Sequence, residues 1–400
     1  MAANSNANAY PVGSAITLAQ LEADPYPVYA QLQALEPISW VEALGMWYLT
    51  RYEDVRAITL DHARFTTAFE RSLILDTFGP QMLSTEGAEH ERYRRAVQAH
   101  FAPGCVRQMY EAAIHVAAVR MIASFKHAGE VELRTQFAAR LPILTMLEVF
   151  GMPLDGERQM RRWYDAFERA LSNFTQDAEV RRRAHEAVRQ FHRYVDDAIA
   201  AVADSGELAL LGALVNAPAG ERLTDAEIRR NMAIIFFGGI STVEALILNS
   251  LWALFEHPTT LQRVQAAPAL LPKVIEETIR WLGPVQSATR HAVQDCSYSG
   301  VRFAAGEAVN CMLAAANRDP RVFAAPERFD IDRPNLHRHL GFATGTHACL
   351  GLHLARAESR IALEHLLELP GLRLIREKSA APSGYEFRQP RSMWIGWNAP

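Results

Sequence analysis

Apolar residues recur every three or four positions along most of the chain, the spacing that gives a helix one buried face. The ranges with this spacing are 24–35, 52–60, 89–101, 105–127, 133–150, 158–171, 178–203, 271–282 and 350–369. Apolar and polar residues alternate over 38–51, as in half-buried strands, and 293–310 and 372–397 are also predicted to form strands. The pattern predicts a mainly α fold with small β-sheets, with Pro142 breaking or kinking one helix.

One predicted helix is unusually long. Thr224 and Glu227 form a capping box, and no proline follows before His257, so the helix spans about 30 residues, or roughly 50 Å. Gly238 and Gly239 lie at its middle, where each glycine costs about 1 kcal/mol. The pair indicates a kink, the close approach of a flat group, or tight packing against another helix.

The remaining stretches have little periodicity. Residues 67–87 predict a long loop and 320–339 an irregular meander. No repeat or long flexible linker divides the chain. We therefore expect a single large catalytic domain over 21–400, preceded by a polar and disordered segment over 1–20.

Charge and cysteine content narrow the class of protein. Lys and Arg total 41 against 45 Asp and Glu, a net charge of −4, which argues against nucleic-acid binding through bulk charge. The four cysteines are scattered without a CxxC pair, so a disulfide scaffold is not indicated. The N-terminus lacks the pattern of a signal peptide, and no apolar run reaches the roughly 18 residues that span a membrane. These features predict a cytoplasmic protein that does not associate with a membrane.

The strongest chemical signal is the pattern F-x-x-G-x-H-x-C-x-G. Its members are Phe342, Gly345, His347, Cys349 and Gly351. The cysteine lies in a glycine-bounded loop just before a predicted helix, where backbone N–H groups and the helix dipole favour a thiolate. A thiolate is a ligand for a soft metal centre, and the glycines let the backbone approach a planar group. The alternatives are an inert buried thiol and a zinc site with nearby histidines, although zinc prefers more regular ligand pairs.

With these motifs, nearly the whole chain from about Asp24 onward resembles the cytochrome P450 family. The resemblance implies the family's mainly α fold, with the long helix crossing over the cofactor haem b, iron protoporphyrin IX. It makes Cys349 the iron ligand and Phe342 its neighbour, within a loop bounded by Gly345 and Gly351. The family usually has glycine where Ala343 stands, a mild departure.

Further motifs follow in the family's order. Glu277 and Arg280 match its ExxR pair, which Arg333 completes by analogy as a brace of the haem pocket. Four residues match positions that bind the haem propionates, for which Arg and His are natural partners. These residues are His90, Arg94, Arg290 and His347.

The centre of the long helix resembles the family's oxygen-binding groove. The resemblance implies that Gly239 leaves room for haem and O2 and that Thr242 steers proton delivery. The acid that normally precedes this threonine is replaced by Ser241. Glu244 is the nearest carboxylate, but at 100° per residue it lies about 160° around the helix from Thr242. Glu244 therefore either takes part in proton relay through a distorted helix or water, or makes a buried structural ion pair or hydrogen bond.

The resemblance implies a haem-thiolate monooxygenase that inserts one atom of O2 into a hydrophobic small molecule. The chain has no flavin or iron–sulfur motif, so electrons would come from a ferredoxin-type partner with its reductase. Substrate contacts are expected from Phe69, Arg71, Leu73, Phe78, Ile234, Ile235, Val285, Ser287 and Ala288, with Arg71 either meeting a carboxylate or simply exposed. Because Ser241 replaces the family's acid, oxidative coupling, desaturation and peroxide-driven oxidation remain alternative activities. A non-catalytic haem sensor is a further alternative.

Overall fold

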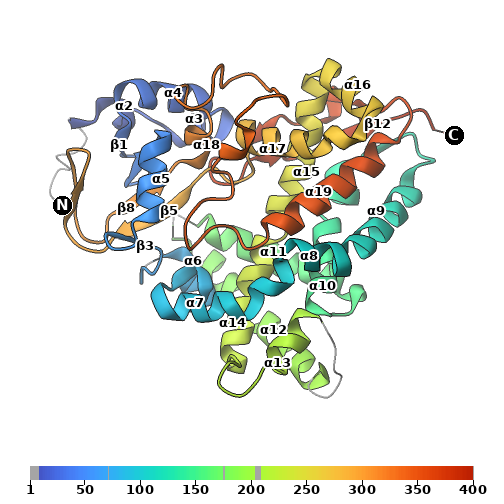
Figure 1. The fold of residues 1–400 in the computed structure, drawn as a ribbon, viewed down its shortest axis with the longest axis horizontal. Coiled ribbons are helices and arrows are strands. Elements are labelled where there is room, and N and C mark those ends of the chain that lie inside the picture. Colours follow the sequence, from blue (N-terminus) through green and yellow to red (C-terminus); the bar gives the residue numbers. More distant parts are fainter. Residues whose placement is uncertain (1–8, 71, 174–175, 203–208, 400) are drawn as a thin grey trace. The chain divides into compact units, whose positions relative to one another are not determined.

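The computed structural model describes residues 9–70, 72–173, 176–202 and 209–399 (Figure 1). The chain forms two compact units. The first contains Met1–Thr67, Ala245–Cys349 and Gly371–Gly396, and the second contains Ala68–Glu244, Leu350–Pro370 and Trp397–Pro400. The predicted mainly α fold with small sheets is confirmed.

A five-stranded sheet in the order β1-β2-β8-β5-β3 organises the first unit. Its strands are β1 (Ile38–Val41), β2 (Met46–Leu49), β3 (Phe65–Thr66), β5 (Ala288–Ala292) and β8 (Ala308–Cys311). Neighbouring strands are antiparallel except for β2 and β8, which run parallel. Trp47 and Phe303 pack edge to face with ring centroids 5.3 Å apart within a buried aromatic and aliphatic cluster. This core fixes β5, the strand that carries Arg290.

Short hairpins and helices complete the first unit. The other strands are β6 (Cys296–Tyr298), β7 (Val301–Phe303), β9 (Arg373–Leu374), β10 (Pro382–Ser383), β11 (Gln389–Pro390) and β12 (Trp394–Gly396). The helices are α2 (Pro11–Ser14), α3 (Leu18–Ala23), α4 (Tyr26–Leu35), α5 (Tyr52–Leu60), α16 (Pro258–Ala266), α17 (Leu271–Trp281) and α18 (Leu313–Ala316).

The second unit is almost entirely helical. Its helices are α6 (Leu73–Phe78), α7 (Gly87–Val97), α8 (Pro103–Cys105), α9 (Glu111–Phe125), α10 (Leu141–Phe150), α11 (Glu157–Leu171), α12 (Ala178–Val202), α13 (Leu210–Val215), α14 (Asp225–Gly238) and α19 (Leu352–Leu367). A short strand, β4 (Glu130–Glu132), also belongs to it. Pro142 occupies the first turn of α10, so the predicted break falls just before this helix.

The long central helix begins as predicted and is interrupted at its glycines. The Thr224 hydroxyl accepts from the Glu227 N–H and the Glu227 carboxylate accepts from the Thr224 N–H, which completes the capping box. α14 ends at Gly238, and α15 (Ser241–Glu256) continues after a break at residues 239–240. The helical stretch Asp225–Glu256 is long and apolar enough to span a membrane by composition alone. However, 83% of its most apolar window is buried inside the protein, as in the core helix of a globular protein.

Two segments that were predicted to lack regular structure contain helices. Within 67–87, α6 and a 3₁₀ turn over Met82–Ser84 form, because Ser72 caps α6 by accepting from the Leu75 N–H. Of the predicted disordered segment 1–20, the structure describes 9–20, where α2 and the start of α3 form and Ile16 is buried. Residues 1–8 lie outside the described residues.

Candidate haem site

The cysteine loop is a tight turn held by its own backbone. The Cys349 N–H donates to the Phe342 carbonyl at 2.9 Å, and the Ala348 N–H donates to the Gly345 carbonyl at 3.1 Å. The Cys349 thiol forms no disulfide and its residue is half-buried. Phe342 lies against the His339 ring, with centroids 6.0 Å apart. The loop therefore keeps the cysteine fixed while leaving it partly accessible.

Two loop residues have left-handed backbone. Gly345 has φ +80°, and a Cβ there would lie 3.2 Å from the Thr59 carbonyl at the end of α5. Glycine is therefore needed at this position for close approach to α5 and for the turn. Ala343 has φ +55°, which explains why the resembling family prefers glycine at this position. Gly351 has φ −86°, and a Cβ added to it would meet nothing within 4 Å, so the space beside its backbone is open among the described residues.

The expected propionate ligands of the first unit share one edge of the sheet. His347 is buried, and its Nε2 lies 3.3 Å from the Thr67 hydroxyl. Thr67 follows β3, whose Thr66 pairs with His291, the residue next to Arg290. Arg290 is 3% exposed, and its guanidinium donates to the Thr289 carbonyl at 3.0 Å. A buried guanidinium on a strand is costly unless an anion or hydrogen-bond acceptors accompany it.

The other two expected propionate ligands lie on α7 in the second unit. His90 is buried and Arg94 is half-buried, one helical turn apart. The neighbouring Tyr93 hydroxyl donates to Glu89 at 2.7 Å and contacts Glu227 at 3.3 Å. Since Glu227 caps α14, these contacts fix α7 against the start of the long helix.

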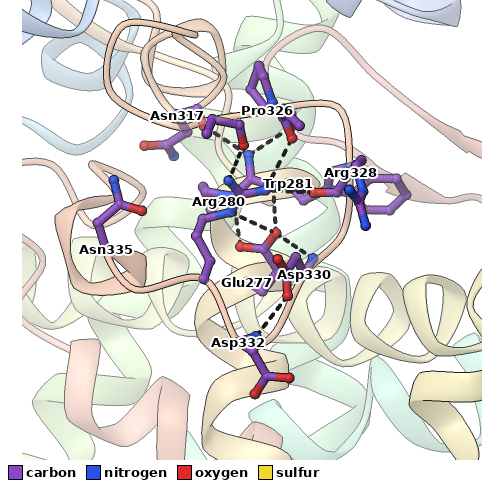
Figure 2. Close-up of polar contacts among 12 residues, drawn as sticks. Glu277, Arg280, Trp281, Asn317, Pro326, Arg328, Asp330, Asp332 and Asn335 are labelled. Atoms are coloured by element: carbon purple, nitrogen blue, oxygen red, sulfur yellow. Dashed lines mark hydrogen bonds and ion pairs between the residues drawn. The ribbon is translucent and has the colours of Figure 1, made fainter.

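The ExxR residues form a fully buried network in the first unit, not a surface ion pair (Figure 2). Arg280 makes two hydrogen bonds to the Glu277 carboxylate, at 2.6 and 2.7 Å. Arg280 also donates to the carbonyls of Asn317, Pro326 and Arg328. Glu277 further accepts from the Asp330 N–H at 2.8 Å, and Arg333 Nε lies 3.4 Å away. The network ties α17 to the meander that leads toward the cysteine loop, as predicted for Arg333.

The break in the long helix places open space at Gly238. A Cβ on Gly238 would have nothing within 4 Å, and Gly238 is exposed although residues 231–237 before it are buried. A Cβ on Gly239 would instead lie 2.6 Å from the Met146 sulfur of α10. We expected Gly239 to leave room for haem and O2. The structure corrects this expectation, because Gly239 packs against α10 and the open position is Gly238. The Thr242 hydroxyl donates to the Gly238 carbonyl at 2.7 Å and borders the open position.

Glu244 is buried beside two arginines of the second unit. Glu244 is 1% exposed, and its carboxylate accepts from Arg134 Nε at 2.6 Å and lies 3.5 Å from Arg161. Burial raises the pKa of Glu244, while the two arginines oppose the rise. Of the two roles left open for Glu244, the structure contains the buried ion pair. Sequence reasoning missed Arg134 and Arg161, because they come from distant segments that carry no local signal of this contact.

Of the expected substrate contacts within the second unit, Phe69 and Leu73 are half-buried and the other described ones are buried. Phe78 is 1% exposed and lies between Phe167 and Phe237, with ring centroids 5.1 and 5.9 Å away. Ile234 and Ile235 are also buried. Arg71 lies outside the described residues. Among the residues that the structure describes, no group of three or more His, Cys, Asp or Glu is placed to hold a metal ion.

Comparison with known proteins agrees with these observations. A family model described as cytochrome P450 matches residues 268–381. The mycinamicin IV hydroxylase/epoxidase of Micromonospora griseorubida is 33% identical over 360 residues, which cover 86% of this chain and 88% of that protein. The biotin biosynthesis cytochrome P450 of Bacillus subtilis is 29% identical over 375 residues, 91% of this chain and 93% of that protein.

Solved structures show the same fold. The crystal structure of CalO2 superimposes with a TM-score of 0.88 at 29% identity, covering 95% of this chain and 98% of that chain. P450BioI, solved in complex with an acyl carrier protein ligated to hexadec-9Z-enoic acid, gives 0.87 at 28% identity, covering 95% and 100%. Sequence identity over most of the chain and the shared fold together place it in the cytochrome P450 family, the haem b-dependent oxidoreductases that act as monooxygenases.

Proposed function

We propose that this monooxygenase inserts one atom of O2 into a hydrophobic small molecule, with electrons delivered by a ferredoxin-type partner and its reductase. We also propose that it acts in the cytoplasm and that residues 21–400 work as one catalytic domain. The apolar surroundings of the long helix support a hydrophobic substrate. The chain has no flavin or iron–sulfur motif, which supports a separate electron donor.

Cys349 is the proposed iron ligand, and the geometry of its loop carries the proposal. A half-buried thiol outside any disulfide, held by the Phe342 carbonyl and the turn at Gly345, has the donor chemistry and the rigidity that a haem-thiolate site needs. The haem, when bound, supplies the oxygen-activating chemistry. The protein's part is to hold the thiolate and exclude other ligands.

The charged residues fit the two carboxylates of a haem. Arg290 and His347 at the sheet edge, together with His90 and Arg94 on α7, are the proposed propionate ligands. Arg290 supports this most strongly, because a 3% exposed guanidinium on a strand suits a charge-assisted bond to a buried carboxylate. Each of these residues would orient the cofactor rather than take part in chemistry.

We propose that Gly238 and Thr242 would border the groove in which O2 binds. The open position at Gly238 offers space for a flat group beside the helix. The Thr242 hydroxyl already donates to the Gly238 carbonyl. Its oxygen can therefore accept a hydrogen bond from a group in the open space beside Gly238. Thr242 would therefore hold and pass on a proton where the substrate reacts.

The absorption spectrum of the reduced, CO-bound protein tests the ligand directly. A strongly red-shifted Soret band is expected for the native protein, and its loss for Cys349→Ala. Cys296→Ala is the matched control, since Cys296 is also a half-buried cysteine of the first unit outside any disulfide. A red-shifted band that survives Cys349→Ala, or a histidine-type band in the native protein, would overturn the assignment.

A second candidate, atypical haem chemistry such as peroxide-driven oxidation, is favoured by one observation. Ser241 replaces the family's acid, and Glu244 is held by Arg134 and Arg161 away from Thr242. Product formed from hydrogen peroxide, but not from NADH with a surrogate ferredoxin system, would support this candidate. NADH-dependent product would exclude it as the main activity.

A further inference from the structure

The first unit contains a cleft of about 760 Å³ whose lining includes none of the proposed haem ligands. It lies between the end of α4, the start of α5, the β6–β7 hairpin and the segment 319–338. Clefts of roughly 300–1,000 Å³ hold small organic molecules. The cysteine loop approaches α5 in its last turn, near Thr59, whereas the cleft is lined by the residues at the beginning of this helix. The cleft is therefore separate from the haem site.

One wall of the cleft is apolar and rigid. Tyr10, Val301 and Val322 line it, and they pack against the buried core cluster that contains Trp47. The Tyr10 ring meets the Trp47 ring edge to face, with centroids 5.0 Å apart. Leu35 also lines the cleft and is 66% exposed. The wall therefore offers apolar surface of fixed shape that a bound molecule would cover.

Three arginines line the same cleft, and Tyr52 at the start of α5 fixes the segments that carry them. Arg51 directly precedes Tyr52. The Tyr52 N–H donates to Asp319 at 2.9 Å, and Asp319 also accepts two hydrogen bonds of 2.9 Å from the Arg321 guanidinium. The Tyr52 hydroxyl donates to the Arg338 carbonyl at 2.7 Å, and the Arg338 guanidinium lies 5.4 Å from the centre of the Tyr52 ring. The positive groups are therefore held in place before any ligand binds.

Each of these arginines keeps donor groups that no described residue accepts from. Arg51 uses Nε and Nη2 on the Gln33 carbonyl, and Arg321 uses the same two groups on its carboxylate partner, which leaves Nη1 of both. Arg338 makes no side-chain hydrogen bond within the part of the chain that the structure describes. The side chains of Arg321 and Arg338 are 50% and 45% exposed, so a molecule in the cleft can reach them.

Most carboxylates of the lining are, in contrast, already engaged by neighbouring residues. Glu36 accepts from two N–H groups of α2, at 2.8 and 3.0 Å, and from the Ser39 hydroxyl at 2.7 Å. Asp319 accepts from two backbone N–H groups in addition to the guanidinium. Asp54 accepts from the Tyr298 hydroxyl at 3.0 Å. These hydrogen bonds use much of the acceptor capacity that the carboxylates would offer to a cation.

Glu53 is the fourth carboxylate of the lining. It is 70% exposed, and its oxygen lies 3.9 Å from an Arg338 nitrogen, beyond hydrogen-bond distance. By formal charge the lining has four carboxylates against three arginines. The donors left for a ligand nevertheless belong to guanidinium groups, which bind carboxylates through paired, charge-assisted hydrogen bonds. The cleft therefore combines an anion-binding side with an apolar wall.

We propose that this cleft binds an amphipathic carboxylic acid as its anion, at a site separate from the haem. The carboxylate accepts hydrogen bonds from the three arginines, and the apolar body of the ligand covers the wall formed by Tyr10, Val301 and Val322. A fatty acid has both parts, one anionic head and one apolar chain. Binding there is non-covalent and does not require the chemistry proposed for Cys349.

Calorimetric titration of the haem-loaded protein with decanoate measures this binding, and decanamide is the neutral probe of the same chain length. We expect decanamide to bind about tenfold more weakly than decanoate, and Arg338→Gln to weaken decanoate binding about tenfold. Glu53→Gln should strengthen decanoate binding about threefold, because it removes a negative charge beside the carboxylate. Arg302→Gln is the matched control, because Arg302 is an exposed arginine next to Val301 that does not line the cleft.

The Soret band of the ferric protein distinguishes the cleft from the haem pocket. Decanoate in the cleft should leave this band unchanged, whereas decanoate beside the haem would shift it. Binding that shifts the Soret band and is equally tight in Arg338→Gln would overturn the proposal. No binding below about 1 mM, or decanamide binding as tightly as decanoate, would overturn it as well.

The two cleft variants also separate a charge effect from a loss of structure. Arg338→Gln should keep the native fold, because the side chain is half-exposed and makes no hydrogen bond among the described residues. Glu53→Gln is expected to act in the opposite direction, which a damaged fold would not do. Weaker decanoate binding in both variants would contradict the proposed role of charge in the cleft.

Discussion

Glu277→Gln tests the idea that the buried ExxR network braces the haem site. One Glu277 oxygen accepts from Arg280, the Asp330 N–H and Arg333, and the other accepts from Arg280 Nε. The Gln amide replaces one carboxylate oxygen with an NH2 group. In either orientation of the amide, this NH2 donor therefore faces N–H groups that had donated to the carboxylate. The substitution also removes the anion beside two buried guanidinium groups.

Breaking a buried charge pair in this way costs about 3–5 kcal/mol. We expect Glu277→Gln to lower the free energy of unfolding by that amount and to reduce haem retention. Urea unfolding followed by circular dichroism, together with haem content per protein, measures both. Glu276→Gln is the control, because Glu276 lies on the same helix but is 22% exposed and pairs with His339 outside the network. A loss below about 1 kcal/mol, equal to the control, would refute the brace.

Other predictions concern stability and the haem contacts. Burial raises the pKa of Glu358 to about 8 from its ordinary value of 4.5, so the folded protein holds a proton that the unfolded chain releases. Stability should therefore fall as pH rises from about 4.5 to 8, and Glu358→Gln should remove that slope in urea midpoints measured across the range. Ala343→Gly should raise the free energy of unfolding by about 1 kcal/mol, because the left-handed backbone strains alanine; no gain in the same assay would contradict this. Arg290→Ala should weaken haem retention on gel filtration more than Arg302→Ala, an exposed arginine of the same unit.

Helix boundaries and motif positions could be predicted from the sequence because they depend on local signals. The Thr224 capping box, Pro142 and the helix 52–60 are encoded by residues a few positions apart. The motif residues around Cys349 and Glu277 form a fixed local pattern, so their loop and helix could be located directly.

Side-chain partners from distant segments could not be predicted in the same way. Nothing in the sequence marks Arg134 or Arg161 as partners of Glu244, since their contacts depend on how helices pack. Likewise, the choice between Gly238 and Gly239 as the open position depends on Met146 of α10. Helix periodicity did indicate a wide angle between Glu244 and Thr242, and the structure pairs Glu244 with Arg134 while Thr242 donates to the Gly238 carbonyl.

A crystal structure of the haem-bound protein would decide whether Cys349 is the iron ligand. We predict that the sulfur of Cys349 is bonded to the haem iron, with Arg290 and His347 on the propionates. An iron bonded to a histidine, or a Cys349 side chain turned away from the porphyrin, would contradict this assignment.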